Sequence, residues 1–86
     1  MYLREREERL MSNHGSLAEK GDLVRVLDAG GRPTNYLGVV MGVRFDSTIT
    51  GPDRKMLLVA ADASLGPAQW SIASYFRIVA RGVWNA

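Results

Sequence analysis

The sequence contains no cysteine, which excludes disulfide bonds and thiolate metal sites. It also lacks any apolar run approaching the roughly 18 residues that a membrane-spanning helix needs. The first eleven residues, MYLREREERLM, are charged throughout and have no apolar segment like that of a signal peptide. We therefore expect a protein that is not secreted through a signal peptide and does not span a membrane, and that works in the cytoplasm or inside a larger assembly.

Residue patterns typical of catalysis are scarce as well. His14 is the only histidine, and its Ser-Asn-His-Gly context predicts a solvated loop residue rather than a general base or a ligand. Gly30 and Gly31 lack the lysine and the following helix of a phosphate loop. The aspartates lie at strand ends and in turns, where they favour local hydrogen bonds: Asp22, Asp28, Asp46, Asp53 and Asp62. The sequence therefore predicts no enzyme, no metal site, no cofactor and no small-molecule substrate.

What the sequence does contain is the composition of one small globular domain. Of its 86 residues, 47% are hydrophobic and 23% are charged, which places the chain away from the composition of disordered proteins. The net charge is +2, and acidic residues interleave with the arginines. This balance is weak evidence for a nucleic-acid partner.

The clearest pattern is the nonapeptide LGVVMGVRF. Its odd positions are all apolar, namely Leu37, Val39, Met41, Val43 and Phe45. A period of two predicts a long strand whose odd-numbered row forms one unbroken core face. Gly38 and Gly42, on the other face, predict a bend or a close approach of backbone.

Alternating patterns and turn residues predict five short strands, at 23–27, 36–45, 56–61, 69–72 and 76–80. Loops at 28–35 and 46–55 and turns at 62–68 and 73–75 separate them. All connections are too short for crossover helices, so the strands should pair antiparallel as a meander. We predict a mainly β fold, a small SH3-like barrel over residues 21–80, with an OB-like barrel as the second choice.

The two ends of the chain are expected to lie outside this barrel. Residues 1–20 are predicted to form a helical arm: Arg4–Glu8 and Glu5–Arg9 have i,i+4 spacing. A further short helical turn at 16–20 has capping-box spacing between its Ser and Glu. Residues 81–86 form a tail whose tryptophan lies where chains ordinarily fray. The terminal apolar residues, which would cap the barrel or dock on a partner, are Leu3, Leu10 and Trp84.

The pattern GDLVRV, a glycine-containing loop and LGVVMGV resembles the KOW motif, which opens the SH3-like barrels of certain ribosomal proteins and transcription elongation factors. The resemblance rests on Gly21, Asp22, Val24, Val26, Gly38, Val40 and Val43. With WSIASYFRIV, the chain is also similar to short SH3-like proteins of tailed phages. Ribosomal members carry several lysines in the first loop, whereas this chain has only Arg32 there.

Two functional hypotheses follow. The first is a non-catalytic protein–protein interaction or structural module that docks through its terminal arms onto copies of itself or onto a larger assembly, such as a phage virion. Amphipathic aromatic residues near strand ends would line a groove beside the first long loop: Tyr36, Trp70 and Tyr75. The alternative for Trp70 is a position in the core. On this hypothesis the protein is cytoplasmic or virion-associated.

The second hypothesis is a KOW-type RNA- or DNA-binding module. Three arginines are predicted on outward strand faces and three further basic residues in loops, namely Arg25, Arg44 and Arg77, then Arg32, Arg54 and Lys55. Together they would track a phosphate backbone. The alternative is a solvated surface of mixed charge.

Overall fold

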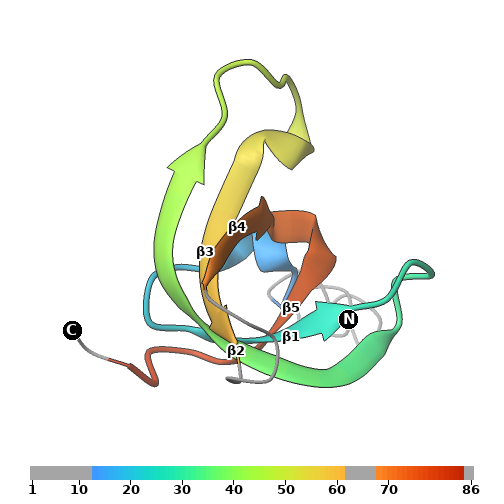
Figure 1. Cartoon of the computed structure of the whole chain (residues 1–86), viewed down its shortest axis with the longest axis vertical. Helices are drawn as coiled ribbons and strands as arrows, with labels where there is room; N and C mark the ends of the chain where they lie inside the picture. The colour runs from blue at the N-terminus through green and yellow to red at the C-terminus, as the bar shows by residue number, and fades with distance from the viewer. Residues whose placement is uncertain (1–12, 62–67, 85–86) are drawn as a thin grey trace, which may run out of the picture.

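The computed structural model describes residues 13–61 and 68–84 (Figure 1). These residues form one five-stranded antiparallel sheet in the order β4-β3-β2-β1-β5. The strands are β1 (Leu23–Leu27), β2 (Pro33–Phe45), β3 (Lys55–Ala61), β4 (Gln69–Ile72) and β5 (Phe76–Ala80). Single 3-10 turns are η1 (Gly15–Leu17), η2 (Pro52–Arg54) and η4 (Ala73–Tyr75). The predicted mainly β fold with antiparallel pairing is confirmed.

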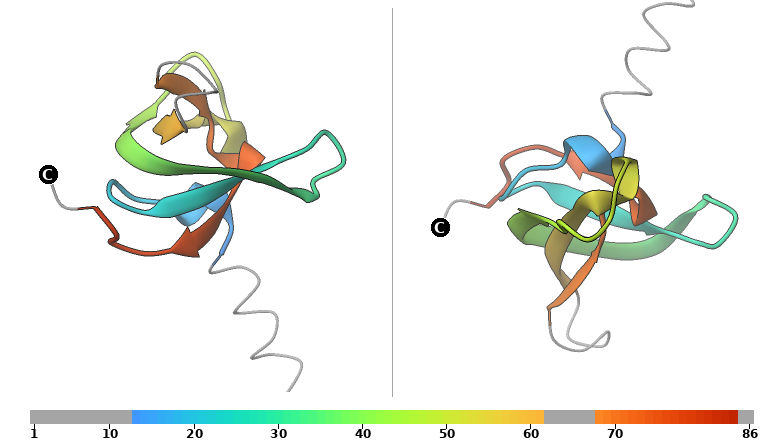
Figure 2. Two further views of the ribbon diagram at one scale, coloured as in Figure 1. Left: turned by 60° about the horizontal axis from the view of Figure 1, so that its bottom comes forward. Right: turned by 90° about the horizontal axis from the view of Figure 1, so that it is seen from above.

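The predicted strands at 23–27, 69–72 and 76–80 match β1, β4 and β5, and the turn at 73–75 is η4. β2 begins at Pro33 rather than at Tyr36, so the predicted loop 28–35 is shorter than expected. Two side-chain bonds extend the pairing: Arg25 Nη1 donates to the Thr34 carbonyl at 2.9 Å, and Thr34 Oγ1 donates to the Val26 carbonyl at 2.7 Å. The remaining β1–β2 loop projects from the molecule (Figure 2).

The sheet has to curl because η4 joins its two edge strands. In a flat sheet, β4 and β5 would lie four strand spacings apart, about 19 Å. The chain from Ile72 to Phe76 reaches at most about 14 Å. Figure 1 accordingly shows β2 arching around the interior of the molecule. The curled sheet is not closed, since β4 and β5 remain its edges.

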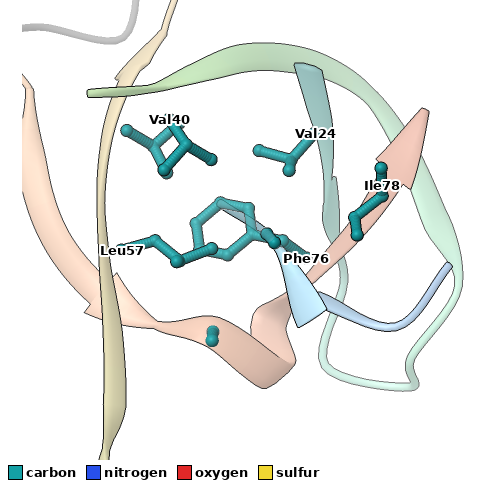
Figure 3. Packing of buried hydrophobic residues seen from close by; sticks show 8 residues of the cluster. Val24, Val40, Leu57, Phe76 and Ile78 are labelled. Atoms are coloured by element: carbon teal, nitrogen blue, oxygen red, sulfur yellow. The ribbon is translucent and has the colours of Figure 1, made fainter. Parts of the chain in front are cut away.

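The core lies on the concave side of this sheet. Val24, Val40 and Leu57, from the three central strands, are fully buried. Figure 3 shows them packed with Phe76 and Ile78 of β5. The other buried apolar residues are Ala18, Val59 and Ala73. The core is therefore small, and each member is expected to matter for stability.

The prediction that the odd-numbered row of β2 forms one core face is wrong. A β-bulge interrupts the β2–β3 pairing between Val40 and Gly42. Before the bulge the buried residues are even-numbered, Gly38 and Val40, and Leu37 is 38% exposed. The extra residue of a bulge reverses the alternation, and Val43 beyond it lies opposite the buried Leu57.

Gly21 and Asp22 join both ends of the described chain at the start of β1. The Asp22 carboxylate is 3% exposed and accepts hydrogen bonds from the Glu19 N–H at 2.8 Å and the Gly82 N–H at 3.0 Å. The Trp84 N–H donates to the Gly21 carbonyl at 3.1 Å. Gly21 has φ of 95°, and a Cβ there would overlap the Trp84 carbonyl oxygen.

The helical turn predicted at 16–20 with a Ser16 cap is wrong. η1 covers Gly15–Leu17 instead, and His14 caps it by accepting the Ser16 N–H on Nδ1 at 3.1 Å. Gly15 packs so tightly that a Cβ would overlap the carbonyl oxygens of Ala73 and Phe76. The helical arm predicted for residues 1–11 lies outside the described residues. Among residues 13–61 and 68–84, no helix has the length and apolar character to cross a membrane.

Candidate interaction surface

Trp70 lies on the convex face of the sheet. Along β4 it is the direct partner of Leu58, which in turn is the partner of Gly42. Since side chains alternate along a strand, Leu58 and Trp70 point away from the core residues Leu57 and Val59. The interpretation of Trp70 as a core residue is therefore wrong, and the half-buried indole forms part of the surface.

The indole lies across two strands beneath a guanidinium group. The Arg44 Cζ is 4.4 Å from the ring centroid of Trp70. A Cβ added to Gly42 would meet Trp70 Cη2 at 3.4 Å, so glycine leaves the space that the ring occupies. The sequence predicts a bend or a close approach of backbone at Gly42. The group that lies closest there is the Trp70 side chain from β4. Such a cation–π contact contributes about 0.5–1 kcal/mol at an exposed site.

A second row beside the first completes this surface. Arg44 pairs with Met56, and Met56 pairs with Ile72. We call the two rows together the Trp70 face: Gly42, Arg44, Met56, Leu58, Trp70 and Ile72. All except the exposed Arg44 are half-buried, and the only charge within the two rows is that of Arg44. Tryptophan, methionine and arginine are the residues enriched in the cores of protein interfaces.

The predicted aromatic trio does not form one site. Tyr75 in η4 is 56% exposed and lines an open groove of about 590 Å³. Tyr36 is 52% exposed on β2 and, like Trp70, does not contribute to the groove lining. The other lining residues are Leu27, Asp28, Ala29, Gly31 and Ser74. A groove beside the first loop therefore exists, with one of the three predicted aromatic residues in it.

The side chains of Asp28 and Ser74 in the groove are already engaged in hydrogen bonds. Asp28 Oδ1 accepts the N–H groups of Gly30 and Arg32, both at 2.9 Å. Ser74 Oγ donates to Asp53 Oδ1 at 3.2 Å, which ties η4 to η2. The bonds to Asp28 are local, as predicted for the aspartates, whereas Asp53 accepts its bond from a residue 21 positions away in the sequence.

The six predicted basic residues are divided among several places. Arg25 and Arg77 are direct cross-strand partners on β1 and β5. Arg44 covers Trp70, and Arg54 lies with its Cζ 5.6 Å from the Phe45 ring centroid. Arg32 lies in the β1–β2 loop. Of the six, Arg25 and Arg77 are the two that the sheet pairs directly with each other.

Lys55 has a structural contact instead. Its Nζ donates to the Ser16 carbonyl at 2.7 Å, which links β3 to η1. Partial burial lowers the pKa of Lys55, and nearby Glu19 opposes the shift.

The terminal cluster predicted from the sequence is only partly described. Leu3 and Leu10 lie outside the described residues. Trp84 is half-buried, its backbone is bonded to Gly21, and Lys20 Nζ lies 5.8 Å from its ring centroid. The tryptophan that was expected to fray thus packs against its own chain.

His14 is exposed, as predicted, and its Nδ1 lies 2.7 Å from Ser16 Oγ. In the part of the chain that the structure describes, no three His, Cys, Asp or Glu side chains gather as a metal site would require.

The sequence pattern places Phe45 in a core row, which is wrong because Phe45 is 59% exposed, and sequence reasoning missed the outward rows of β3 and β4. Comparison of the chain with protein-family models, with curated proteins and with solved structures finds no significant match.

Proposed function

We propose that this protein is a non-catalytic protein–protein interaction module whose contact surface is the Trp70 face. The observation that carries the proposal is the position of Trp70, on the convex surface beneath Arg44 rather than in the core. Tryptophan and arginine are over-represented among interface residues whose truncation to alanine costs about 2 kcal/mol or more of binding free energy. The surrounding apolar side chains would exclude water from that contact.

We further propose that the curled sheet is an SH3-like barrel that serves as a rigid carrier for this face. Support comes from the return of β5 to pair with β1 and from the three-residue η4 that draws β4 toward β5. The pattern at Gly21 and Asp22 agrees, because these residues anchor the start of β1. The phage-virion or accessory role rests on the sequence resemblance alone.

Trp84 and the two N-terminal leucines, Leu3 and Leu10, have different roles in the proposal. Trp84 serves the fold through Gly21, so we assign it no direct contact with the partner. Leu3 and Leu10 keep the docking role predicted from the sequence, because the chain enters the described structure at an edge of the sheet. There the Ile78 N–H donates to the Asn13 carbonyl at 2.8 Å.

The test is affinity capture from the source cells with the full chain and three single variants. Trp70→Ala and Arg44→Glu remove the central contact, whereas Arg77→Glu makes the same charge reversal on β5. We expect the first two variants to lose a protein that the parent chain and Arg77→Glu retain. The captured protein, once purified, should bind Trp70→Ala at least about tenfold more weakly, which corresponds to about 1.4 kcal/mol. Equal binding by all four chains would overturn the proposal.

The nucleic-acid alternative is favoured by one observation, the direct opposition of Arg25 and Arg77. Like charges at this spacing are unfavourable without an anion between them. An RNA or DNA backbone would supply that anion, and its binding should weaken steeply as salt rises. Fluorescence anisotropy with a labelled oligonucleotide tests this, with Arg77→Glu as the variant and Arg44→Glu as its charge-matched control. Absence of binding at low salt would exclude the alternative.

A further inference from the structure

The two edges of the sheet differ in how they are covered. The β5 edge is met by the chain itself, through the bond from Ile78 to Asn13 and a β-bridge between His14 and Arg77. The outer edge of β4 pairs with no strand of the described residues. An unpaired edge offers a row of backbone donors and acceptors to another strand.

β4 also lacks the features with which proteins usually block such pairing. Its sequence is Gln69-Trp70-Ser71-Ile72, with no charge and no proline, and its pairing with β3 has no bulge. Among residues 13–61 and 68–84, its only protection is its length of four residues. A ladder this short needs support from side chains, and the Trp70 face extends to this edge.

The geometry of that face suits a second copy of the chain. The two rows end on β4 with Trp70 and Ile72, which are two residues apart and point to the same face. If two β4 strands pair antiparallel about a twofold axis at Ser71, Trp70 of each copy lies opposite Ile72 of the other. Opposed side chains then share a face, as an antiparallel pair requires. Aromatic residues opposite β-branched residues are a favourable cross-strand pair.

We propose that two copies of this protein associate through β4 in that register, which joins their sheets across a twofold axis. Each row then continues into the other copy: Gly42, Leu58 and Trp70 are followed by Ile72, Met56 and Arg44 of the second copy. The two Arg44 side chains lie at opposite ends of the joined rows, so the interface brings no like charges together. The inference rests on the proposed function, because the pairing joins two Trp70 faces into one continuous contact surface.

Cysteine cross-linking tests the register, since the chain has no cysteine of its own. On the axis, Ser71→Cys places two thiols opposite each other, within the Cα separation of about 4.4–6.8 Å that a disulfide requires. Gln69→Cys is the matched control, because its two copies would be offset by four residues, about 13 Å. Under mild oxidation we expect a covalent dimer of Ser71→Cys and none of Gln69→Cys. Failure of Ser71→Cys to cross-link, or equal cross-linking of both variants, would overturn the proposal.

Sedimentation velocity over a wide concentration range measures the association without cross-linking. Ile72→Lys should weaken dimerisation at least about tenfold. It replaces the apolar residue that lies opposite Trp70 of the second copy, and it adds a charge at the joined edge. Val79→Lys, an exposed residue of β5, should dimerise as the parent chain does. Circular dichroism melting of both variants verifies that they fold. A monomeric parent chain whose Trp70 face still captures another protein would overturn this inference alone. A monomeric parent chain that captures no protein through this face would overturn the proposed function as well.

Discussion

Gly42 lies beneath the indole of Trp70, and the absence of a side chain on β2 lets a side chain from β4 cross the intervening strand. We expect Gly42→Val to displace the ring, because its γ-methyl groups extend beyond a Cβ that already approaches Trp70 at 3.4 Å. Displacement removes the Arg44 contact, worth about 0.5–1 kcal/mol. Tryptophan fluorescence should change in Gly42→Val and be nearly unchanged in Gly42→Ala. An unaltered spectrum in Gly42→Val would contradict this account of the glycine.

How far this arrangement was predictable depends on the strand. Strands 23–27, 69–72 and 76–80 were bounded correctly, since turn residues flank short runs rich in β-branched and aromatic side chains. β3 reads KMLLVAA and is apolar on both faces, so nothing local indicated whether Leu57 or Leu58 faces the core. Trp70 pairs with Leu58 and therefore lies on the convex face only because Leu57 is the residue that faces the core. The position of Trp70 could not be deduced from the sequence for this reason.

The bulge in β2 limited prediction in a different way. Gly42, at the bulge, indicates a bend, but nothing within LGVVMGVRF indicates that the alternation reverses there, so a regular period of two is the natural interpretation. The anchoring of Trp84 was equally hidden. It depends on hydrogen bonds between residues about sixty positions apart, one to the Gly21 carbonyl and one to the Asp22 carboxylate, which no local pattern encodes.

Asp22 provides the second prediction. Its buried carboxylate accepts two backbone N–H groups, from Glu19 and Gly82, and Arg81 Nη1 lies 3.5 Å away. Asp22→Ala leaves both donors without a partner and should lower the free energy of unfolding by about 1–3 kcal/mol for each donor that stays buried. Asp22→Asn keeps one acceptor oxygen, so its free energy of unfolding should fall by less than that of Asp22→Ala. Chemical denaturation measures the difference, and equal stability of the two variants would contradict the assignment.

The same carboxylate holds the tail, which gives a local test. In Asp22→Ala the Gly82 N–H loses its acceptor, and the only described backbone bond left to the tail is that from Trp84 to Gly21. We expect carboxypeptidase to remove C-terminal residues faster from Asp22→Ala than from the parent chain under native conditions. Asp28→Ala, which changes an exposed turn, is the matched control and should be digested at the parent rate.

Arg25 and Arg77 give the third prediction. They oppose each other directly, and Arg25 is already bonded to the Thr34 carbonyl. Arg77→Glu converts a like-charge pair into an opposite-charge pair, worth about 0.2–1 kcal/mol of added stability. The gain should shrink as salt rises, because Arg77 is exposed. Thermal melts at low and high salt measure it, with Arg77→Gln giving about half the gain; no gain at low salt would indicate that another group already neutralises the pair.

Asp46 gives the last prediction, on pH. Its Oδ1 accepts hydrogen bonds from Thr48 Oγ1 at 2.6 Å and from the Thr48 N–H at 2.9 Å. The side-chain bond first and the backbone bond second lower the pKa of Asp46 below its ordinary 3.8. A depressed carboxyl pKa stabilises the fold above the unfolded value, and this contribution is lost as the pH falls through the folded value. Thr48→Val should therefore raise the pKa toward 3.8 in an NMR titration, while Thr48→Ser keeps it low. A pKa in Thr48→Val as low as in the parent chain would show that the hydroxyl is not the main cause.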